Sequence, residues 1–146
     1  MSTAPTLAYE VDARTVQAGH SEVSAKRATI AFDSSPQTSA ELPGPAELLC
    51  SAFAACLLKN VERFSEILPF SQHGASVHVS AEREQTPPMF TRIRYRLEVV
   101  TEEAPERVEH LHRNLAKYGT VYNTIARACE VSGDVVGIAP EEPGPE

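Results

Sequence analysis

The sequence predicts an α+β fold in which mainly antiparallel sheets surround a buried central helix. Three observations lead to this prediction. Segments that alternate apolar and polar residues stand on both sides of one long apolar run, that run has the composition of a buried helix, and a second, amphipathic helix precedes a final strand. Strands and helices that are segregated along the chain are typical of the α+β class.

The N-terminal part predicts a β-hairpin followed by a loop. Residues 7–16 and 22–32 are rich in Val, Thr and Ile, and the segment 17–20, Gln-Ala-Gly-His, separates them. Two such runs joined by a short segment that contains glycine form a hairpin. Residues 33–45 are rich in Ser, Pro, Thr and Gly, so we expect a loop that leads into the central helix.

The predicted central helix covers residues 43–64, PGPAELLCSAFAACLLKNVERF, and carries Cys56 near its middle. Pro45 suits the first helical position, and Glu47 complements the positive end of the helix dipole. Nearly every side chain from Leu48 to Leu58 is apolar or small. A helix that is apolar on all sides is a buried helix.

One copy of a chain of this length has difficulty in covering such a helix on all sides. A domain of 146 residues leaves much of its surface exposed, and the strands available to it are short. We therefore expect an obligate homodimer whose interface covers the central helix.

The C-terminal half predicts two strands, two helices and a last strand. Residues 75–82 alternate between apolar and polar, and the clearest strand alternates Ile93, Tyr95, Leu97 and Val99 with Arg92, Arg94, Arg96 and Glu98. We expect the apolar set to face the core and the charged set to face water. The remaining elements are an amphipathic helix at 102–117 that Gly119 stops, a short helix at 121–128, and a strand at 131–138 that residues 132–134 interrupt.

The chain has 146 residues and a net charge of −7. This length fits one domain, for which we expect the bounds 7–139, with a flexible N-terminus at 1–6 and a disordered acidic tail at 140–146. The acidic balance argues against nucleic acid or an anionic membrane as a partner, because phosphate binding needs a basic face. No apolar run approaches the length of a membrane span.

The expected location is the cytoplasm. The segment MSTAPTLAYE has no basic stretch followed by an apolar one, which a secretory signal would need. Three cysteines without tight spacing do not form the pattern of a secreted disulfide framework. A reduced setting is then the default expectation.

Cys56 is the first candidate for chemistry, although its neighbours Ala55 and Leu57 are equally consistent with a small core residue. Cys50 lies six positions earlier on the predicted helix. That spacing puts the two Cα atoms about 10 Å apart, beyond the reach of an unstrained disulfide. Cys129 is remote in sequence and approaches either cysteine only through the fold.

The sequence predicts no metal site and no cofactor. His110 and His112 are two positions apart on a predicted helix and so point to different faces, unlike a metal-binding pair four residues apart. Arg92, Arg94 and Arg96 form a basic strip that we interpret as a solvated face. The sequence has no phosphate-binding glycine loop and no nucleophile elbow.

Two motifs resemble the signatures of the OsmC/Ohr family. Residues 43–58, PGPAELLCSAFAACLL, resemble the family's helix, in which a Pro-Glu-x-Leu type of start leads to a Cys after an Ala-Ala or Ser-Ala pair. Residues 118–125, YGTVYNTI, resemble the second signature, which is usually Cys-Pro-Val followed by Ser or Tyr, Asn and Thr-Leu. The order of strands and helices matches from about residue 7 to 138, and the implied OsmC-like fold is an intertwined homodimer whose two central helices are clasped by both subunits' sheets.

The resemblance also implies an activity. The family's better-known members are thiol peroxidases that reduce organic hydroperoxides, and the match places Cys56 as the peroxidatic thiol. In this chemistry the thiolate attacks a peroxide oxygen and becomes a sulfenic acid, which a second Cys captures as a disulfide.

Three positions differ from the family pattern. Gly119 stands where the family has its second Cys. Ala46 stands where the family has a catalytic Glu, and Glu47 follows one residue later, about 100° around a helix. The activating Arg that is expected in the first hairpin turn has no direct match, and Arg14 and Arg27 are the nearest candidates.

The leading hypothesis is therefore an OsmC-like homodimer with a thiol-dependent peroxidase or redox role. Cys56 would be the nucleophile, a small-molecule hydroperoxide the substrate and an external thiol the reductant. Glu47 would orient a cation, Arg14 or Arg27 would supply that cation, and Cys129 would be a substitute resolving thiol.

The alternative hypothesis is a non-enzymatic OsmC-like dimer that binds a small apolar ligand at the subunit interface. In that case Cys56 only fills space in the core. A basic side chain of the second subunit beside the Cys56 sulfur would favour the enzyme, with Arg14, Lys26 and Arg27 as the candidates, whereas a purely apolar lining would favour the binding protein.

Overall fold

The computed structural model describes residues 4–141. Within them the elements are, in order, β1 (Asp12–Gln17), β2 (His20–Ala25), β3 (Ala28–Asp33), α1 (Pro45–Ile67), β4 (Ala75–Gln85), β5 (Pro88–Val100), α2 (Pro105–Tyr118), α3 (Thr120–Ala126) and β6 (Glu130–Ile138). The chain divides into an N-terminal unit that ends at Leu49 and a C-terminal unit that begins at Cys50. Half of the predicted flexible N-terminus and most of the predicted acidic tail lie outside the described residues.

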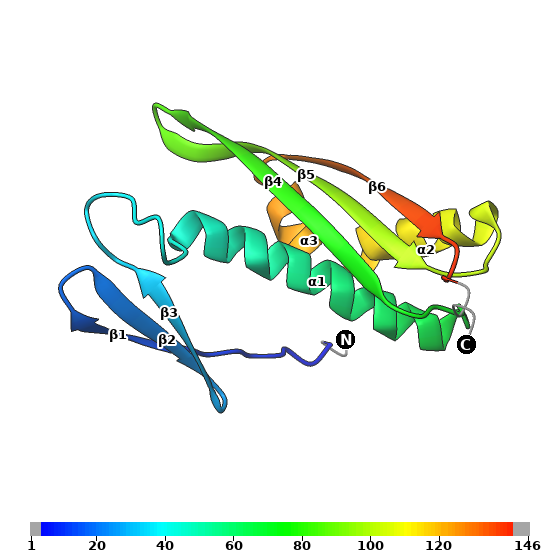
Figure 1. Ribbon diagram of the computed structural model, residues 1–146, viewed down its shortest axis with the longest axis horizontal. Coiled ribbons are helices and arrows are strands. Elements are labelled where there is room, and N and C mark those ends of the chain that lie inside the picture. Colours follow the sequence, from blue (N-terminus) through cyan, green and yellow to red (C-terminus); the bar gives the residue numbers. More distant parts are fainter. Residues whose placement is uncertain (1–3, 142–146) are drawn as a thin grey trace. The chain divides into compact units, whose positions relative to one another are not determined.

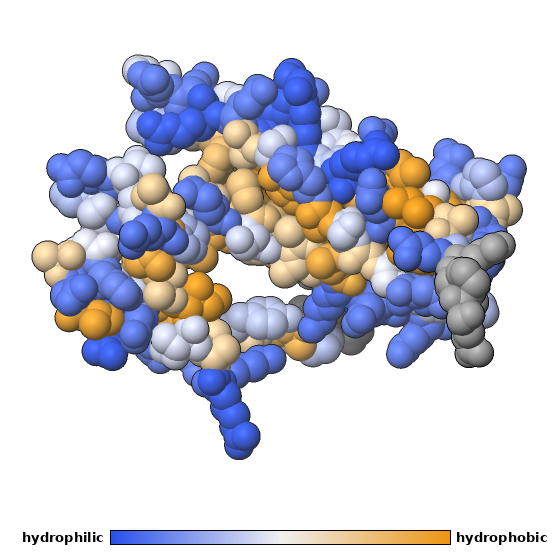
Figure 2. Space-filling model, in the orientation of Figure 1, coloured by the Kyte–Doolittle hydropathy of each residue, from blue (hydrophilic) through white to orange (hydrophobic). Residues whose placement is uncertain are grey.

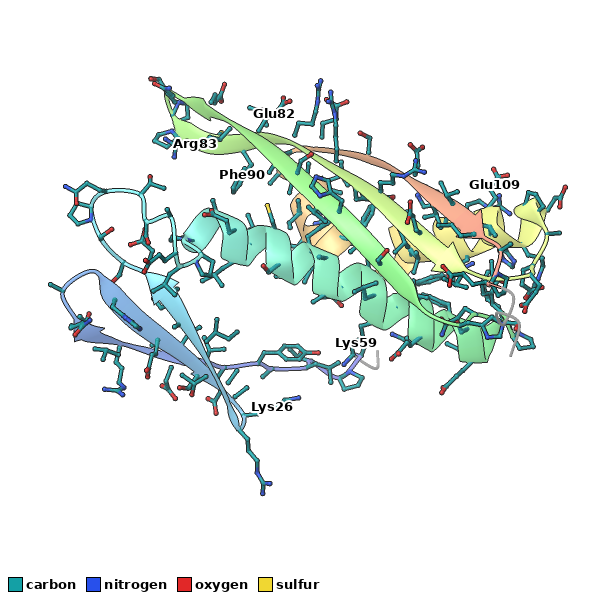
Figure 3. All side chains as sticks on the ribbon, in the orientation of Figure 1. Lys26, Lys59, Glu82, Arg83, Phe90 and Glu109 are labelled. Carbon is teal, nitrogen blue, oxygen red and sulfur yellow. The ribbon has the colours of Figure 1, made fainter. Side chains whose placement is uncertain are left out.

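The N-terminal unit contains a three-stranded antiparallel sheet, β1-β2-β3, drawn in blue to cyan in Figure 1. Gly19 lies in the first turn with a φ of 79°, a left-handed conformation that glycine adopts without strain. Lys26 lies in the second turn with a φ of 55°, and its side chain points away from the strands (Figure 3). The predicted strand at 22–32 is therefore wrong. It is two strands, and the sequence hides the break because no Gly or Pro marks the turn.

The predicted loop before the central helix is held by one carboxylate. Asp33 Oδ1 accepts hydrogen bonds from the N–H and the hydroxyl of Ser35, at 2.9 and 2.6 Å, and Oδ2 accepts one from the N–H of Ser39 at 2.8 Å. These hydrogen bonds lower the pKa of Asp33, because they favour its ionised form. The Asp33 N–H in turn donates to the carbonyl of Pro43 at 2.8 Å, so both ends of the loop are tied together.

The second sheet, β4-β5-β6, belongs to the C-terminal unit and has β5 at its centre. β4 pairs antiparallel with β5, as predicted, but β6 pairs parallel with it. Parallel neighbours need a crossover connection, which α2 and α3 supply. β6 also runs unbroken through residues 132–134, with Gly133 directly opposite Tyr95. The predicted interruption of the last strand is therefore wrong.

The two faces of β5 differ as the alternation predicts. Its buried residues are Ile93, Tyr95, Leu97 and Val99, while Arg94 and Arg96 are exposed. On the outer face the Arg92 guanidinium lies 3.2 Å from the Glu130 carboxylate, and Arg96 lies 3.5 Å from Glu98. The hydrophilic colour continues over the tip of the β4–β5 hairpin in Figure 2, where Figure 3 places Glu82 and Arg83.

The helices of the C-terminal unit pack against the inner face of this sheet. The Tyr95 ring contacts Phe53 of α1, His112 of α2 and Tyr122 of α3, with ring centroids 5.7, 5.8 and 5.9 Å apart. All three helices therefore lie on the same side of β5, as Figure 1 shows. The core consists of Phe53, Leu57, Val61, Phe64, Phe70, Ile93, Tyr95, Leu97, Val99, Val108, Leu111, Leu115 and Ile125.

Gly133 is needed for close approach rather than for its backbone freedom. A Cβ atom at this position would lie 2.4 Å from the Tyr95 carbonyl oxygen and 2.5 Å from two carbons of the Tyr95 ring. Any side chain here would displace β6 or the ring. The ring of Tyr95 therefore has its position because the neighbouring strand offers a residue without a side chain.

The α1 helix begins at Pro45 and carries one buried face. Within the C-terminal unit its buried residues are Phe53, Leu57, Asn60, Val61 and Phe64, whose spacing of three and four residues is that of one helix face. Ser51, Ala52 and Ala55 are exposed. One copy of the described chain thus leaves a face of small residues open, and its burial by a second subunit stays a prediction. None of the helices in residues 4–141 is long and apolar enough to cross a membrane.

Candidate functional site

Cys56 lies on α1, one turn after the buried Phe53, and its side chain is a partly exposed free thiol. The Phe53 ring stacks on the Tyr122 ring of α3, with centroids 5.4 Å apart and planes 29° apart. Residues three apart lie on the same face of a helix. The thiol is therefore on the face of α1 that meets α3.

Gly119 lies against the sulfur. A Cβ atom built on Gly119 would be 3.0 Å from Cys56 Sγ and 3.0 Å from Tyr122 Cβ. The backbone of Gly119 has φ −74° and ψ 123°, which any residue adopts. The helix therefore does not end here through a left-handed glycine. What distinguishes position 119 is close packing, because a Cβ atom there would also lie 3.2 Å from the Leu115 carbonyl oxygen, so the sulfur and its neighbours would have to shift slightly.

A buried amide also contacts the sulfur. Asn60 is one turn after Cys56 and only 8% exposed. Its Nδ2 donates to the Cys56 carbonyl oxygen at 2.8 Å and lies 3.6 Å from Cys56 Sγ. Because an amide NH₂ carries two hydrogens, it can make both contacts at once.

Tyr122, which packs beside Gly119, belongs to a hydrogen-bonded cluster. The Tyr95 hydroxyl lies 2.6 Å from His112 Nε2 and 3.2 Å from the Tyr122 hydroxyl. Burial raises the pKa of Tyr95 and is the main cause, with the hydrogen bond to Tyr122 second. Tyr95 therefore stays a neutral phenol that joins β5, α2 and α3 at one point.

His112 connects this cluster to a groove between α2 and β6. The groove has a volume of about 520 Å³ and is also lined by Glu109 and Asp134. Burial lowers the pKa of His112, although both carboxylates act in the opposite direction. Among the described residues, no group of three or more His, Cys, Asp or Glu side chains is arranged to hold a metal ion.

Cys129, the candidate second thiol, has different surroundings. It follows α3 and packs against the core, and its S–H donates to the Ile125 carbonyl with a sulfur–oxygen distance of 3.6 Å. Burial raises its pKa. Cys56 and Cys129 are both free thiols, so no bridge joins them in this structure.

The remaining predicted site residues belong to the N-terminal unit. Arg14 lies on β1, where its exposed guanidinium is 3.3 Å from the Glu22 carboxylate, and Arg27 lies in the turn between β2 and β3. Glu47 is in the first turn of α1, nine residues before Cys56, and its carboxylate accepts a hydrogen bond from the Gly44 N–H at 3.4 Å. The catalytic roles suggested for these three residues stay predictions.

The sequence assigned no role in the site to four residues: Asn60, which contacts the thiol, and the hydrogen-bonded Tyr95, His112 and Tyr122. The Asn60 contact has a local signal, because residues four apart on a helix are neighbours. The Tyr95 cluster has none, because its hydrogen bonds join residues 17 and 27 positions apart along the chain. The ring of His112 packs edge-on against Tyr95, which adds a second contact between α2 and β5.

Several solved structures share this fold. An OsmC-like protein from Mycoplasma pneumoniae has a TM-score of 0.82 at 17% identity, with 90% of this chain and 98% of that chain covered. An organic hydroperoxide resistance protein OsmC from Legionella pneumophila has a TM-score of 0.70 at 15% identity, over 90% and 99% of the two chains. An organic hydroperoxide resistance protein from Elizabethkingia anophelis, with thiocyanate bound, has a TM-score of 0.73 at 12% identity, over 92% and 100%.

At these identities the similarity establishes the fold alone. A search of curated proteins finds no significant match. The sequence model of the family described as OsmC-like protein matches residues 38–133, which include α1 with Cys56 and the segment around Gly119. This match spans about two thirds of the 146 residues. The chain therefore belongs to the OsmC-like protein family.

Proposed function

We propose that this protein is a thiol-dependent peroxidase that acts on organic hydroperoxides through Cys56. The proposal rests on one observation, the contact between the Cys56 sulfur and Gly119. A Cβ atom built on Gly119 would lie 3.0 Å from Cys56 Sγ. The two sequence motifs of the family meet at this contact. Two structural relatives are named as organic hydroperoxide resistance proteins, which supports the same substrate class.

The proposed reaction has two stages. The Cys56 thiolate attacks one oxygen of the hydroperoxide, an S–O bond forms and the O–O bond breaks. The leaving alkoxide takes up a proton and departs as an alcohol, and the sulfur is oxidised to a sulfenic acid. Because Gly119 carries no thiol, an external thiol then attacks the sulfenic sulfur and releases water, and a second external thiol reduces the mixed disulfide.

A homodimer is part of the proposal. The exposed small residues of α1, Ser51, Ala52 and Ala55, would be covered by a second copy of the helix. The cation that helps to form the thiolate would come from the N-terminal strands of that second copy, with Arg14, Lys26 and Arg27 as the candidates. The proposed location is the cytoplasm, where external thiols are kept reduced.

The test follows the loss of cumene hydroperoxide in the presence of a dithiol. We expect consumption by the native protein and by Cys129→Ser, and none above background by Cys56→Ser. Mass spectrometry of the native protein should show an added oxygen at Cys56 after a brief exposure without the dithiol. If native protein and Cys56→Ser consume peroxide at the same rate, the enzymatic role is refuted and the alternative of a ligand-binding dimer takes its place.

A further inference from the structure

The amide of Asn60 is a polar group in direct contact with the Cys56 sulfur. Within residues 4–141, the hydrogen bond that the structure records to Cys56 Sγ comes from Asn60 Nδ2, at 3.6 Å. The N-terminal end of the α1 dipole is too far away to help, because its effect fades within the first turn and Cys56 lies eleven residues after Pro45.

We propose that Asn60 is a catalytic residue that donates a hydrogen bond to the Cys56 sulfur and stabilises its thiolate. The inference rests on the proposed function, because it names a second residue of the same site. A hydrogen bond to an ionised acceptor is shorter and about twice as strong as one between neutral groups. Asn60 therefore favours the form of Cys56 that attacks a peroxide.

The position of the amide is set in advance. Its hydrogen bond to the Cys56 carbonyl, at 2.8 Å, fixes the side chain on the turn that carries the thiol. Asn60 is 8% exposed, so little water competes for its second hydrogen. A donor that is already oriented needs no rearrangement when charge develops on the sulfur.

Asn114 on α2 provides a matched control. Its Nδ2 donates to the His110 carbonyl at 2.8 Å, the same bond over four residues that Asn60 makes, without a sulfur beside it. Ser65 on α1 provides a second comparison, because its hydroxyl donates to the Val61 carbonyl at 2.6 Å. A serine on this helix thus keeps the bond to the carbonyl, and at position 60 its shorter side chain would withdraw the donor from the sulfur.

The experiment measures the rate at which iodoacetamide alkylates Cys56 between pH 5 and 10, with the modified residue identified by mass spectrometry. We expect Asn60→Leu and Asn60→Ser to slow alkylation of Cys56 at pH 7 by about tenfold and to move the midpoint of the pH profile upward. Asn114→Leu should leave both unchanged. Asn60→Ser keeps the test valid if Asn60→Leu does not fold.

The outcomes separate this inference from the proposed function. Native alkylation behaviour in Asn60→Ser, or an equal loss in Asn114→Leu, would overturn the role of Asn60 whatever the protein does with peroxide. A native protein that fails to consume peroxide, but whose alkylation profile shifts when Asn60 is replaced, would overturn the peroxidase and leave the amide–thiolate contact established.

Discussion

Two partly buried thiols of the C-terminal unit, Cys56 and Cys129, are held by hydrogen bonds of opposite direction. The sulfur of Cys56 faces a donor, the Asn60 amide at 3.6 Å. The sulfur of Cys129 faces an acceptor, the Ile125 carbonyl, also at 3.6 Å. A donor stabilises a thiolate, whereas an acceptor stabilises the neutral thiol. Similar burial therefore does not make these two cysteines chemically similar.

The largest expected effect comes from placing a second thiol beside Cys56. In a disulfide, each Cβ stands about 3 Å from the sulfur of the partner, given an S–S bond of about 2.05 Å. The 3.0 Å between Cys56 Sγ and the Cβ position of Gly119 meets this condition. Gly119→Cys should therefore form a disulfide with Cys56 under mild oxidation, seen as a cross-linked peptide and a loss of two hydrogens in mass.

Cys129 serves as the internal control for that variant. Adding Cys56→Ser to Gly119→Cys should abolish the cross-link and leave Cys129 unmodified. If the introduced thiol paired with Cys129 instead, the contact between position 119 and Cys56 would be wrong, and the difference drawn between the two thiols would lose its structural basis.

A direct comparison of the two thiols should show a smaller but clear difference. At pH 7.5 we expect iodoacetamide to modify Cys56 at least about ten times faster than Cys129, because burial raises the pKa of Cys129 and Cys56 faces a donor. Residue-specific mass spectrometry of the native protein over a time course measures both rates in one sample. Equal rates would show that the direction of the hydrogen bond does not control reactivity here.

The smallest expected effect concerns His112, which is hydrogen-bonded to the Tyr95 hydroxyl. Burial lowers the pKa of His112, so the unfolded chain binds a proton more readily than the folded one. Stability is then fully present above the ordinary His pKa of about 6.5 and is lost as the pH falls through the lower pKa of the folded state. Urea unfolding should show a lower midpoint at pH 5 than at pH 7.5.

Replacing the histidine tests this assignment. His112→Gln should reduce the difference between the two urea midpoints, because the titrating group is gone. His78→Gln, at an exposed position on β4, should leave the difference as it is. If both variants behave like the native protein, another group causes the acid sensitivity and the pH response does not come from His112.

The sequence predicted some parts of the fold and the site and not others. Features that depend on residues close together in the sequence were predicted, and contacts between distant residues were not. The apolar run identified α1, the alternation on β5 identified the core face, and the two motifs brought Cys56 and Gly119 to attention separately. The turn at Lys26 escaped because its left-handed residue is not a glycine. The parallel pairing of β6 depends on a crossover, which alternation along one strand does not encode.

Because Gly133 packs directly on Tyr95, a substitution on β6 can affect the protein although Gly133 makes no contact with the Cys56 sulfur. A methyl group added there would press on the aromatic ring, whose hydroxyl is bonded to His112 and Tyr122. The disturbance would pass through Tyr122 to the surroundings of Cys56, although Gly133 itself has no reactive group. Natural or engineered substitutions on this strand can therefore abolish the proposed activity of Cys56 while every residue that takes part in the chemistry is unchanged.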